Sequence, residues 1–269
     1  MKLPSIAVVT VVRNSPDALR VTAKNVLEQT YPNLRYYVVD GASTDGTVEV
    51  LSDISPLLAG WKSEPDKGIY DAMNKAADMV SEDWIVFMNA GDSFADRNAL
   101  LKIAECLTSD AAVILGASHK VWKDEYGERV FLERPTDVKD LWWRMPTPHQ
   151  SVLVRSELQR KYRFDTTYRW CADQDLLVRL MRDDYQFCFS KEVISIFDCA
   201  GGQSRKLSLY ITERWRISGK VAPWYKRYPA FAMEWSSYLI WGPIVVFIKS
   251  LLPKSAIRAM RVIRGTTGK

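Results

Sequence analysis

Four aspartates in this 269-residue chain stand where a sheet of parallel strands would collect its ligands. Asp40 and Asp92 each follow an apolar run, and Asp66 and Asp173 lie in polar loops. Ligands of α/β sheets bind outside the carboxyl ends of the strands, so we expect the four carboxylates to share one cleft. Their oxygens suit a divalent cation that bridges a diphosphate, and Asp92 is the residue expected to contact it. Each aspartate alone is better explained as a turn cap or a solvated side chain, so the prediction depends on the set.

The elements that must position these residues alternate between strand and helix in the first half of the chain. The strand patterns are apolar and rich in β-branched residues, as strands buried on both faces are. This βαβ order predicts an α/β fold with a Rossmann-like, doubly wound and mostly parallel sheet flanked by helices. The expected strands are residues 6–12, 34–39, 61–64 and 85–88, and the expected helices are 18–29, 48–52 and 69–80.

The order changes after about residue 115, where strands begin to follow one another. We therefore expect one domain, residues 1–205, with a nucleotide-binding half (1–115) and a second half (116–205). In this region the expected helices are 98–106 and 176–181, and the expected strands are 111–115, 117–122, 130–132, 151–154, 187–189 and 193–197.

The remaining segment, residues 206–269, differs from the rest in charge. It carries 12 Lys and Arg against 2 acidic residues, a net +10; the whole chain is +5, so residues 1–205 carry −5. It also holds four Trp and four Tyr, a mixture typical of proteins at a membrane interface. Residues 238–248 form an apolar run, and Lys254, Arg258, Arg261 and Arg264 recur at helical spacing, which predicts a basic amphipathic helix.

We therefore predict that residues 206–269 form a helical tail that attaches the protein to the inner face of a bacterial plasma membrane. A homo-oligomer interface is the alternative use of this tail. A nucleic-acid partner is not expected, because the acidic first part of the chain would repel phosphate backbones.

Composition also bears on the compartment and excludes some classes of protein. Four Cys without a Cys-x-x-Cys pair, and two His in all, give no zinc pattern and suit a reducing cytoplasm. The first apolar run is followed by Arg13-Asn14-Ser15-Pro16 where a signal peptide would have a cleavage site, so no export signal is expected. No stretch reaches the roughly 18 apolar residues of a membrane span.

Several motifs, in order along the chain, resemble those of family 2 glycosyltransferases, which have the GT-A fold. The resemblance covers roughly residues 5–205 and is closest to bacterial enzymes that build capsule, exopolysaccharide or O-antigen repeats. It implies inverting transfer of a sugar from a nucleoside-diphosphate sugar, a UDP-sugar first of all, with Mn²⁺ or Mg²⁺ as cofactor. The motifs are residues 6–14, Glu28-Gln29-Thr30-Tyr31-Pro32-Asn33, Val38-Val39-Asp40-Gly41-Ala42-Ser43-Thr44-Asp45-Gly46-Thr47, 63–75 and 87–92.

The resemblance implies a set of donor contacts at matching positions. Thr10 and Asp40 match residues that hold the base and ribose, and Arg13 lies beside them. Asp66 and Lys67 match the segment that lies against the nucleotide and its diphosphate.

The stretch from Asn89 to Asp92 matches the acidic metal motif of the family, in which Asp92 would hold the metal. Asn89 and Gly91 stand where many members have aspartates, a departure that bears on how strictly the reaction depends on a metal. His149 and Gln150 match a pair next to the donor sugar. Asp71 stands where many relatives have an arginine.

On the acceptor side, Asp173 matches the catalytic base, which draws the proton from an acceptor hydroxyl. Asp175 and Trp170 are the candidates for acceptor contacts, although Asp175 fits a helix-start role equally well. Gly202 and Ser204 belong to a loop that matches one covering the diphosphate in relatives.

Together these features predict a metal-dependent, inverting glycosyltransferase, cytoplasmic and peripheral on the membrane, whose acceptor is a glycan or lipid-linked oligosaccharide. One alternative is a catalytically silent module that binds nucleotide or glycan, against which Asp92 and Asp173 argue. Another is a sugar-nucleotide pyrophosphorylase, but that reaction normally brings a glycine-rich loop with Arg and Lys after the first strand, and residues 12–16 lack it.

Overall fold

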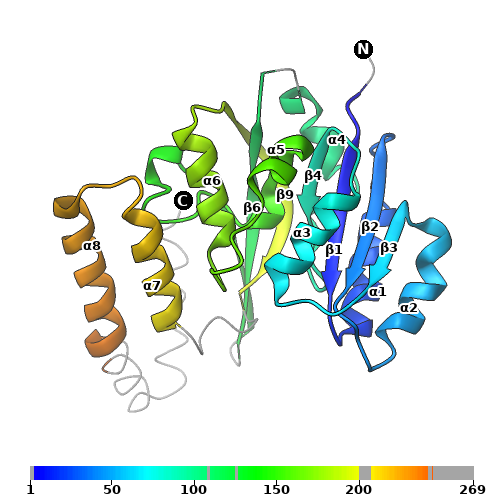
Figure 1. Ribbon diagram of the computed structural model, residues 1–269, viewed down its shortest axis with the longest axis horizontal. Helices are drawn as coiled ribbons and strands as arrows, with labels where there is room; N and C mark the ends of the chain where they lie inside the picture. Colours follow the sequence, from blue (N-terminus) through cyan, green and yellow to red (C-terminus); the bar gives the residue numbers. More distant parts are fainter. Residues whose placement is uncertain (1–2, 108–109, 125–126, 200–206, 242–243, 245–269) are drawn as a thin grey trace.

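The fold is built on one mixed β-sheet with helices on both faces (Figure 1). The structure is a computed structural model, and it describes residues 3–107, 110–124, 127–199, 207–241 and 244. Along the sheet the strand order is β3-β2-β1-β4-β8-β6-β9-β5, and β7 pairs with β6.

The first half of the sheet is parallel, as the βαβ order predicted. Every residue of β1 is buried, so its β-branched side chains pack against helices on both faces. The strands are β1 (Ile6–Val12), β2 (Leu34–Asp40), β3 (Gly60–Ser63) and β4 (Trp84–Phe87), and the helices between them are α1 (Pro16–Leu27), α2 (Thr47–Ile54) and α3 (Ile69–Met79).

The second half joins the first through an antiparallel pair, β4 with β8, so the sheet as a whole is mixed. Among the strand pairings described here, β6 with β9 is parallel and the other four are antiparallel, so the predicted parallel character is concentrated in the first half. The elements here are β5 (Ser93–Phe94), β6 (Val113–Asp124), β7 (Gly127–Glu133), β8 (Val152–Arg155) and β9 (Phe187–Asp198), with α4 (Ala99–Lys102), η2 (Ala104–Leu107), η3 (Val138–Asp140) and η4 (His149–Ser151).

Two pairs of short strands expected from the sequence are each one long strand, β6 and β9. Their pairing shifts register between Leu115 and Ser118, around Gly116. A Cβ at Gly116 would lie 2.2 Å from Ile194 Cδ1, so the glycine makes room for this side chain where the register shifts. The sequence showed a break at this point, and the structure shows that the strand continues through it.

The helices cover the two faces of the sheet in a way that follows the alternation of strand residues. Ala7 and Val9 face the cluster that contains α3, α5 (Ser156–Tyr162) and α6 (Ala172–Arg182). Ile6 and Val8 face the cluster that contains α1, α2 and α4. Because successive strand residues point to opposite faces, both layers are needed to bury β1.

Two helices of the second half differ from expectation. Helix α5 was not predicted, and α6 begins at Ala172, four residues before the expected start. Asp173 and Asp175 therefore lie in the first turn of α6 and not in a loop, a position that favours acidic side chains at the positive end of a helix.

The C-terminal segment forms two further helices beside α6, α7 (Leu207–Ser218) and α8 (Trp224–Ser236), followed by the short π-helix η6 (Ser237–Trp241) (Figure 1). Within the described residues, no helix combines the length and apolar character needed to cross a bilayer. The basic helix expected around Lys254 to Arg264, and the loop with Gly202 and Ser204, lie outside the described residues.

Candidate active site

Two residues expected to contact the base and ribose are enclosed by the sheet. Thr10 lies inside β1, where its hydroxyl donates to Met88 O at 2.7 Å and accepts from the Tyr36 hydroxyl at 2.9 Å. Asp40 is fully buried at the end of β2, and its carboxylate accepts hydrogen bonds from the backbone N–H (2.9 Å) and the hydroxyl of Ser43. Polar groups at such positions must find their partners inside the protein. Both side chains are therefore engaged inside the protein, Asp40 in the loop after β2, and contacts of Thr10 and Asp40 with the base and ribose stay predictions.

Gly41, next to Asp40, provides space for another carboxylate. A Cβ at Gly41 would lie 2.2 Å from Asp66 Oδ2 and 3.2 Å from Arg13 Cδ. The other oxygen of Asp66 accepts from Gly68 N at 2.8 Å, which fixes the side chain in this position. The side chains of Asp66 and Arg13 therefore both lie close to the backbone of Gly41, and both remain candidates for nucleotide contacts.

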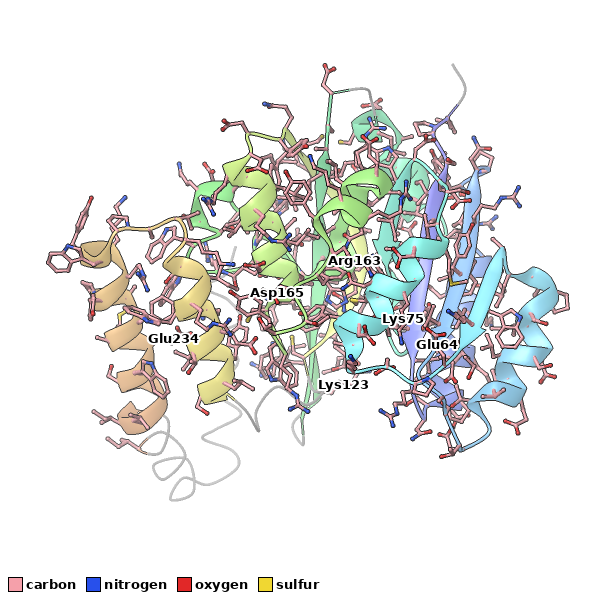
Figure 2. The ribbon with its side chains drawn as sticks, in the orientation of Figure 1. Glu64, Lys75, Lys123, Arg163, Asp165 and Glu234 are labelled. Atoms are coloured by element: carbon pink, nitrogen blue, oxygen red, sulfur yellow. The ribbon has the colours of Figure 1, made fainter. Side chains whose placement is uncertain are left out.

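Asp71, which replaces the arginine of many relatives, organises the turn before α3. Its Oδ2 accepts from Lys67 N at 3.0 Å and lies 3.2 Å from Lys75 Nζ, which also pairs with Glu64 at 3.3 Å (Figure 2). The hydrogen bond from Lys67 N holds the pKa of Asp71 below its usual range. This resembles the acid of a capping box, so Asp71 has a structural role, and the side chain of Lys67 stays exposed.

The turn after β4 explains the glycine in the metal motif. Gly91 has φ +97°, in the left-handed region that an aspartate would adopt only with strain. Thr22 of α1 holds this turn, since its hydroxyl accepts from Gly91 N at 2.9 Å and donates to Asp92 O at 2.8 Å. The backbone of Asp92 is therefore fixed by a contact with α1.

The sheet brings His149 to Asp92, although the two residues are far apart in the sequence. His149 Nε2 lies 3.9 Å from Asp92 Oδ2 and 3.0 Å from Asn89 Nδ2. Burial lowers the pKa of His149 to about 4, so its ring is neutral near pH 7. Burial raises the pKa of Asp92 to about 6, against the opposing effect of hydrogen bonds from the Gln150 side chain and the Asn89 backbone.

These groups fit a divalent cation that is shared with a diphosphate. Asp92 offers a carboxylate and His149 an uncharged ring nitrogen, and Asn89 Oδ1 is buried without a hydrogen-bond partner. Among the described residues, no group of three or more His, Cys, Asp or Glu is placed to hold a metal. A cation here would need phosphate oxygens or water to complete its coordination, as Mg²⁺ usually does.

Asp173 has the environment of a general base. Its Oδ1 accepts from Gln174 N at 2.8 Å and lies 3.2 Å from the Tyr70 hydroxyl. Burial raises the pKa of Asp173 to about 6; these two hydrogen bonds oppose the rise, and the negative charge of Glu213 adds to it. Such a carboxylate is largely ionised at neutral pH and more basic than an ordinary aspartate, which suits proton transfer.

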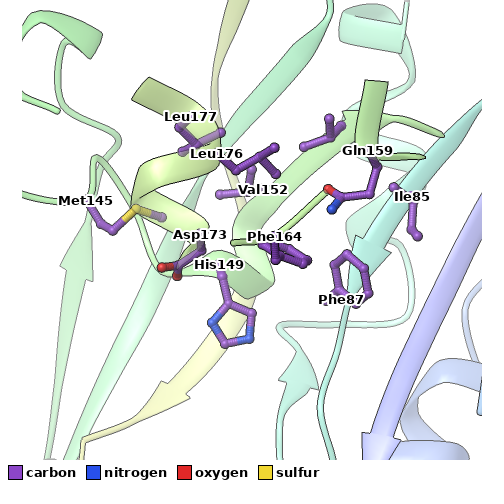
Figure 3. A pocket seen from close by; sticks show the side chains of 11 residues that line it. Ile85, Phe87, Met145, His149, Val152, Gln159, Phe164, Asp173, Leu176 and Leu177 are labelled. Carbon is purple, nitrogen blue, oxygen red and sulfur yellow. The ribbon is translucent and has the colours of Figure 1, made fainter. Parts of the chain in front are cut away.

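A largely apolar pocket is lined by residues of β4, β8, α5 and α6 and by His149. Asp173 and His149 lie next to one another at one end of it, and Phe87 and Phe164 line it further in (Figure 3). Gln159 also faces the pocket; it is 1% exposed, and neither atom of its amide group has a hydrogen-bond partner. The expected base and the expected donor-side histidine therefore share one pocket.

The two expected acceptor residues differ in their surroundings. Asp175 is buried, with one oxygen 2.8 Å from Arg179 Nε and the other 2.5 Å from Lys220 Nζ, so its carboxylate is engaged in two ion pairs and does not cap α6, whose N-cap is Cys171. Trp170 is half-buried beside α6, and its indole N–H has no hydrogen-bond partner, so it remains a candidate.

Two residues next to Asp173 had no role in the sequence interpretation. Tyr70 lies within the motif at 63–75, but nothing in the motif shows that it reaches Asp173. Glu213 lies outside the region of resemblance, and its one signal is that it is one of only two acidic residues in a basic segment.

Comparison with known proteins identifies the family of this sequence. The model of the family described as glycosyl transferase family 2 matches residues 7–177. An uncharacterized glycosyltransferase of Mycobacterium tuberculosis is 32% identical over 184 residues, which are 65% of this chain and 68% of that protein. A PGL/p-HBAD biosynthesis glycosyltransferase of Mycobacterium bovis is 24% identical over 205 residues, 72% of this chain and 73% of that protein.

Solved structures show the same fold at low sequence identity. TarS 1–349 of S. aureus in complex with UDP has a TM-score of 0.61 at 14% identity, covering 87% of this chain and 71% of that one. The mannosyltransferase PcManGT of Pyrobaculum calidifontis, in complex with GDP-Man and Mn²⁺, has a TM-score of 0.62 at 16% identity, covering 99% and 81%. The expected GT-A type of fold is thereby confirmed.

Proposed function

This chain belongs to glycosyl transferase family 2, and from that membership and the geometry of its cleft we propose that it is an inverting transferase. It moves one sugar from a nucleoside-diphosphate sugar, a UDP-sugar in the first instance, to a hydroxyl of a glycan acceptor. The observation that carries the proposal is the shared pocket, in which His149, 3.9 Å from Asp92, lies next to Asp173. A transferase needs its leaving-group site and its base within one substrate of each other, and this arrangement supplies both.

On the donor side, Arg13 and Asp66 receive the nucleotide, and the exposed Lys67 lies close enough in sequence to reach its phosphates. A divalent cation, held by Asp92 with Asn89 and His149 beside it, would offset the charge that develops on the departing nucleoside diphosphate. The binding of UDP by TarS, and of GDP-Man with Mn²⁺ by PcManGT, supports this division of roles.

On the acceptor side, Asp173 takes the proton of the acceptor hydroxyl as the hydroxyl oxygen bonds to the anomeric carbon. The bond from that carbon to the diphosphate breaks in the same step, so the sugar inverts. The proton ends on Asp173 and the electron pair on the diphosphate. His149 and Gln150 border the donor sugar, and Trp170 contacts the acceptor.

The acceptor we propose is lipid-linked, at the inner face of a bacterial membrane, in the synthesis of a surface polysaccharide. Support comes from α8, whose exposed side includes Trp224 (69% exposed), Tyr225 (59%) and Tyr228 (59%), next to Lys226 and Arg227. Aromatic rings and cations on one helix suit the headgroup region of an anionic membrane. The family relationship to a PGL/p-HBAD biosynthesis glycosyltransferase is consistent with such an acceptor.

The catalytic part of the proposal is tested with the purified full chain and a panel of UDP- and GDP-sugars, with and without Mn²⁺ or Mg²⁺. We expect release of nucleoside diphosphate from at least one donor, faster with a lipid-linked glycan acceptor. Nucleotide binding without release from any donor would point to the silent binding module, and neither binding nor release would refute the proposal.

The membrane part is tested by sedimentation with vesicles of phosphatidylglycerol and phosphatidylcholine. We expect the wild type to bind anionic vesicles, and the triple variant Trp224→Ser, Tyr225→Ser, Tyr228→Ser to bind less while keeping its donor turnover. Unchanged vesicle binding, or a shift of the wild type to a dimer that the triple variant abolishes, would favour an oligomer interface.

A further inference from the structure

Glu213 is an acidic residue that the basic C-terminal segment keeps in a buried position. It lies on α7 and is 3% exposed. Its Oε1 accepts from Arg169 N at 2.7 Å, and its Oε2 accepts from Trp170 N at 2.9 Å and Cys171 N at 3.1 Å. One carboxylate therefore binds three consecutive backbone N–H groups of the turn that leads into α6.

Burying the Glu213 carboxylate has a free-energy cost, which its hydrogen bonds to the turn must offset. A buried carboxylate loses its hydration, and in the described part of the chain no Lys or Arg lies within ion-pair distance of Glu213. Its charge is held by the three N–H groups, bonds that are stronger than neutral hydrogen bonds because the acceptor is ionised. Successive N–H groups that converge on one anion also fix the backbone conformation that presents them.

The turn held by Glu213 carries the groups that surround Asp173. Cys171 is the N-cap of α6, and Asp173 lies two residues on, in the first turn. The Tyr70 hydroxyl lies 2.9 Å from Trp170 O and 3.2 Å from Asp173 Oδ1, and it has one proton to share between them. A shift of the turn would therefore move Asp173 and change whether the Tyr70 hydroxyl donates to Trp170 O or to Asp173 Oδ1.

We propose that Glu213 is a positioning residue for Asp173, so that helix α7 of the C-terminal segment is part of the active site. The inference rests on the proposed role of Asp173 as the base, and it extends the reacting machinery beyond the region matched by the family model, residues 7–177.

Glu213 also acts on Asp173 through its charge. The ionisable groups that face Asp173 are Tyr70 on α3, His149 in η4, Cys171 before α6, and Tyr210 and Glu213 on α7. The pKa values of Tyr70, Cys171 and Tyr210 are raised, chiefly by burial, and that of His149 is lowered by burial, so these four are neutral near pH 7. Glu213 is the member of this group that helps to raise the pKa of Asp173.

The test compares Glu213→Gln with Glu213→Asp, using hydrolysis of the donor sugar nucleotide by water as the probe reaction, so that no acceptor need be known. Glu213→Gln removes the charge and places an NH₂ group against backbone N–H groups. We expect its kcat to fall about tenfold to a hundredfold, with the donor KM unchanged and the acid limb of the pH profile moved to lower pH. Glu213→Asp keeps the charge but shortens the reach, so kcat should fall while the acid limb stays in place.

Two variants serve as matched controls. Thr212→Ala changes the exposed neighbour of Glu213 on α7, and Lys220→Gln breaks a contact between the C-terminal segment and α6 at Asp175 without touching the turn at 169–171. Both should keep the wild-type acid limb and kcat, even if Lys220→Gln lowers the melting temperature.

The outcomes separate this inference from the proposed function. A folded Glu213→Gln enzyme with wild-type kcat and acid limb would limit Glu213 to a structural role and overturn the inference, while leaving the transferase intact. If Glu213→Gln does not fold, Glu213→Asp provides the test, and a wild-type kcat in that variant overturns the inference. No turnover of any donor by the wild type would refute the proposed function, and with it this inference.

Discussion

The proposed donor side and the proposed acceptor side of the cleft are built in different ways. On the donor side, Asp40 is held by Ser43 and the turn at Gly91 by Thr22, contacts within or between adjacent βα units. On the acceptor side, Asp173 is surrounded by Tyr70 from α3 and by a turn that Glu213 of α7 holds. The turns on the donor side are therefore held mainly by the first four strands and their helices, with His149 and Gln150 added at Asp92. The acceptor side depends on contacts across most of the chain. Changes in the C-terminal segment should affect the acceptor side first.

The largest expected effect comes from Asp173→Asn, which should lower sugar transfer about a thousandfold and leave donor binding unchanged. The amide cannot take the acceptor proton, whereas the proposed nucleotide contacts lie on the other side of the cleft. Transfer is measured as product formation, and donor affinity by calorimetry. Glu157→Gln, an exposed acid of α5 in the same half, is the control and should match the wild type. Loss of donor binding in Asp173→Asn would show that the two sides are not separable.

The second test is Asp92→Asn, which should lower kcat/KM for the donor about a hundredfold and weaken the response to Mn²⁺. The reason is that Asp92 is the one carboxylate among the three groups placed to hold the cation. The measurement is nucleoside diphosphate release against Mn²⁺ concentration. Asp96→Asn, four residues on and paired with Lys102, is the matched control. A variant of Asp92 with an unaltered Mn²⁺ response would remove Asp92 from the proposed metal site.

A smaller effect is expected from Gly41→Ala, about tenfold weaker nucleotide binding. The added Cβ would lie 2.2 Å from Asp66 Oδ2, so the carboxylate must move. Backbone strain should not contribute to the loss of binding, because Gly41 is not among the residues with positive φ. In an Asp66→Ala background, Gly41→Ala should not weaken nucleotide binding any further, and this double-mutant cycle is the control. Additive effects would mean that Gly41 acts by some route other than Asp66.

The smallest effect is a gain in stability for Asp173→Asn, by about 2 kcal/mol or a few degrees in melting temperature near pH 8. Burial raises the pKa of Asp173 to about 6, so the folded protein disfavours the ionised form, and the amide removes this cost above that pH. At pH 5 Asp173 is protonated in the folded state, and the gain should shrink. A gain that does not depend on pH would show that the charge of Asp173 is not strained by its surroundings.

Prediction from the sequence succeeded where the signals were local. Buried strands such as β1 and β4, and helices such as α1 and α3, follow from the periodicity of apolar residues, and the family resemblance followed from motifs in the same region. It failed where an element depends on its neighbours in space: β6 and β9 each continue through a break expected from the sequence, α5 was not expected, and α6 begins four residues early.

The sequence by itself determined the family and the parallel half of the sheet, and it singled out Asp66 and Asp92 as candidates for the donor side, because these depend on short-range patterns and turn chemistry. Only the tertiary structure decided the surroundings of Asp173, where Tyr70, His149 and Glu213 come together. The physical reason is that three backbone N–H groups before α6 needed a partner, and nothing local supplied one. Their partner is a carboxylate 42 residues beyond Cys171, which only the folding of α7 against α6 brings into reach.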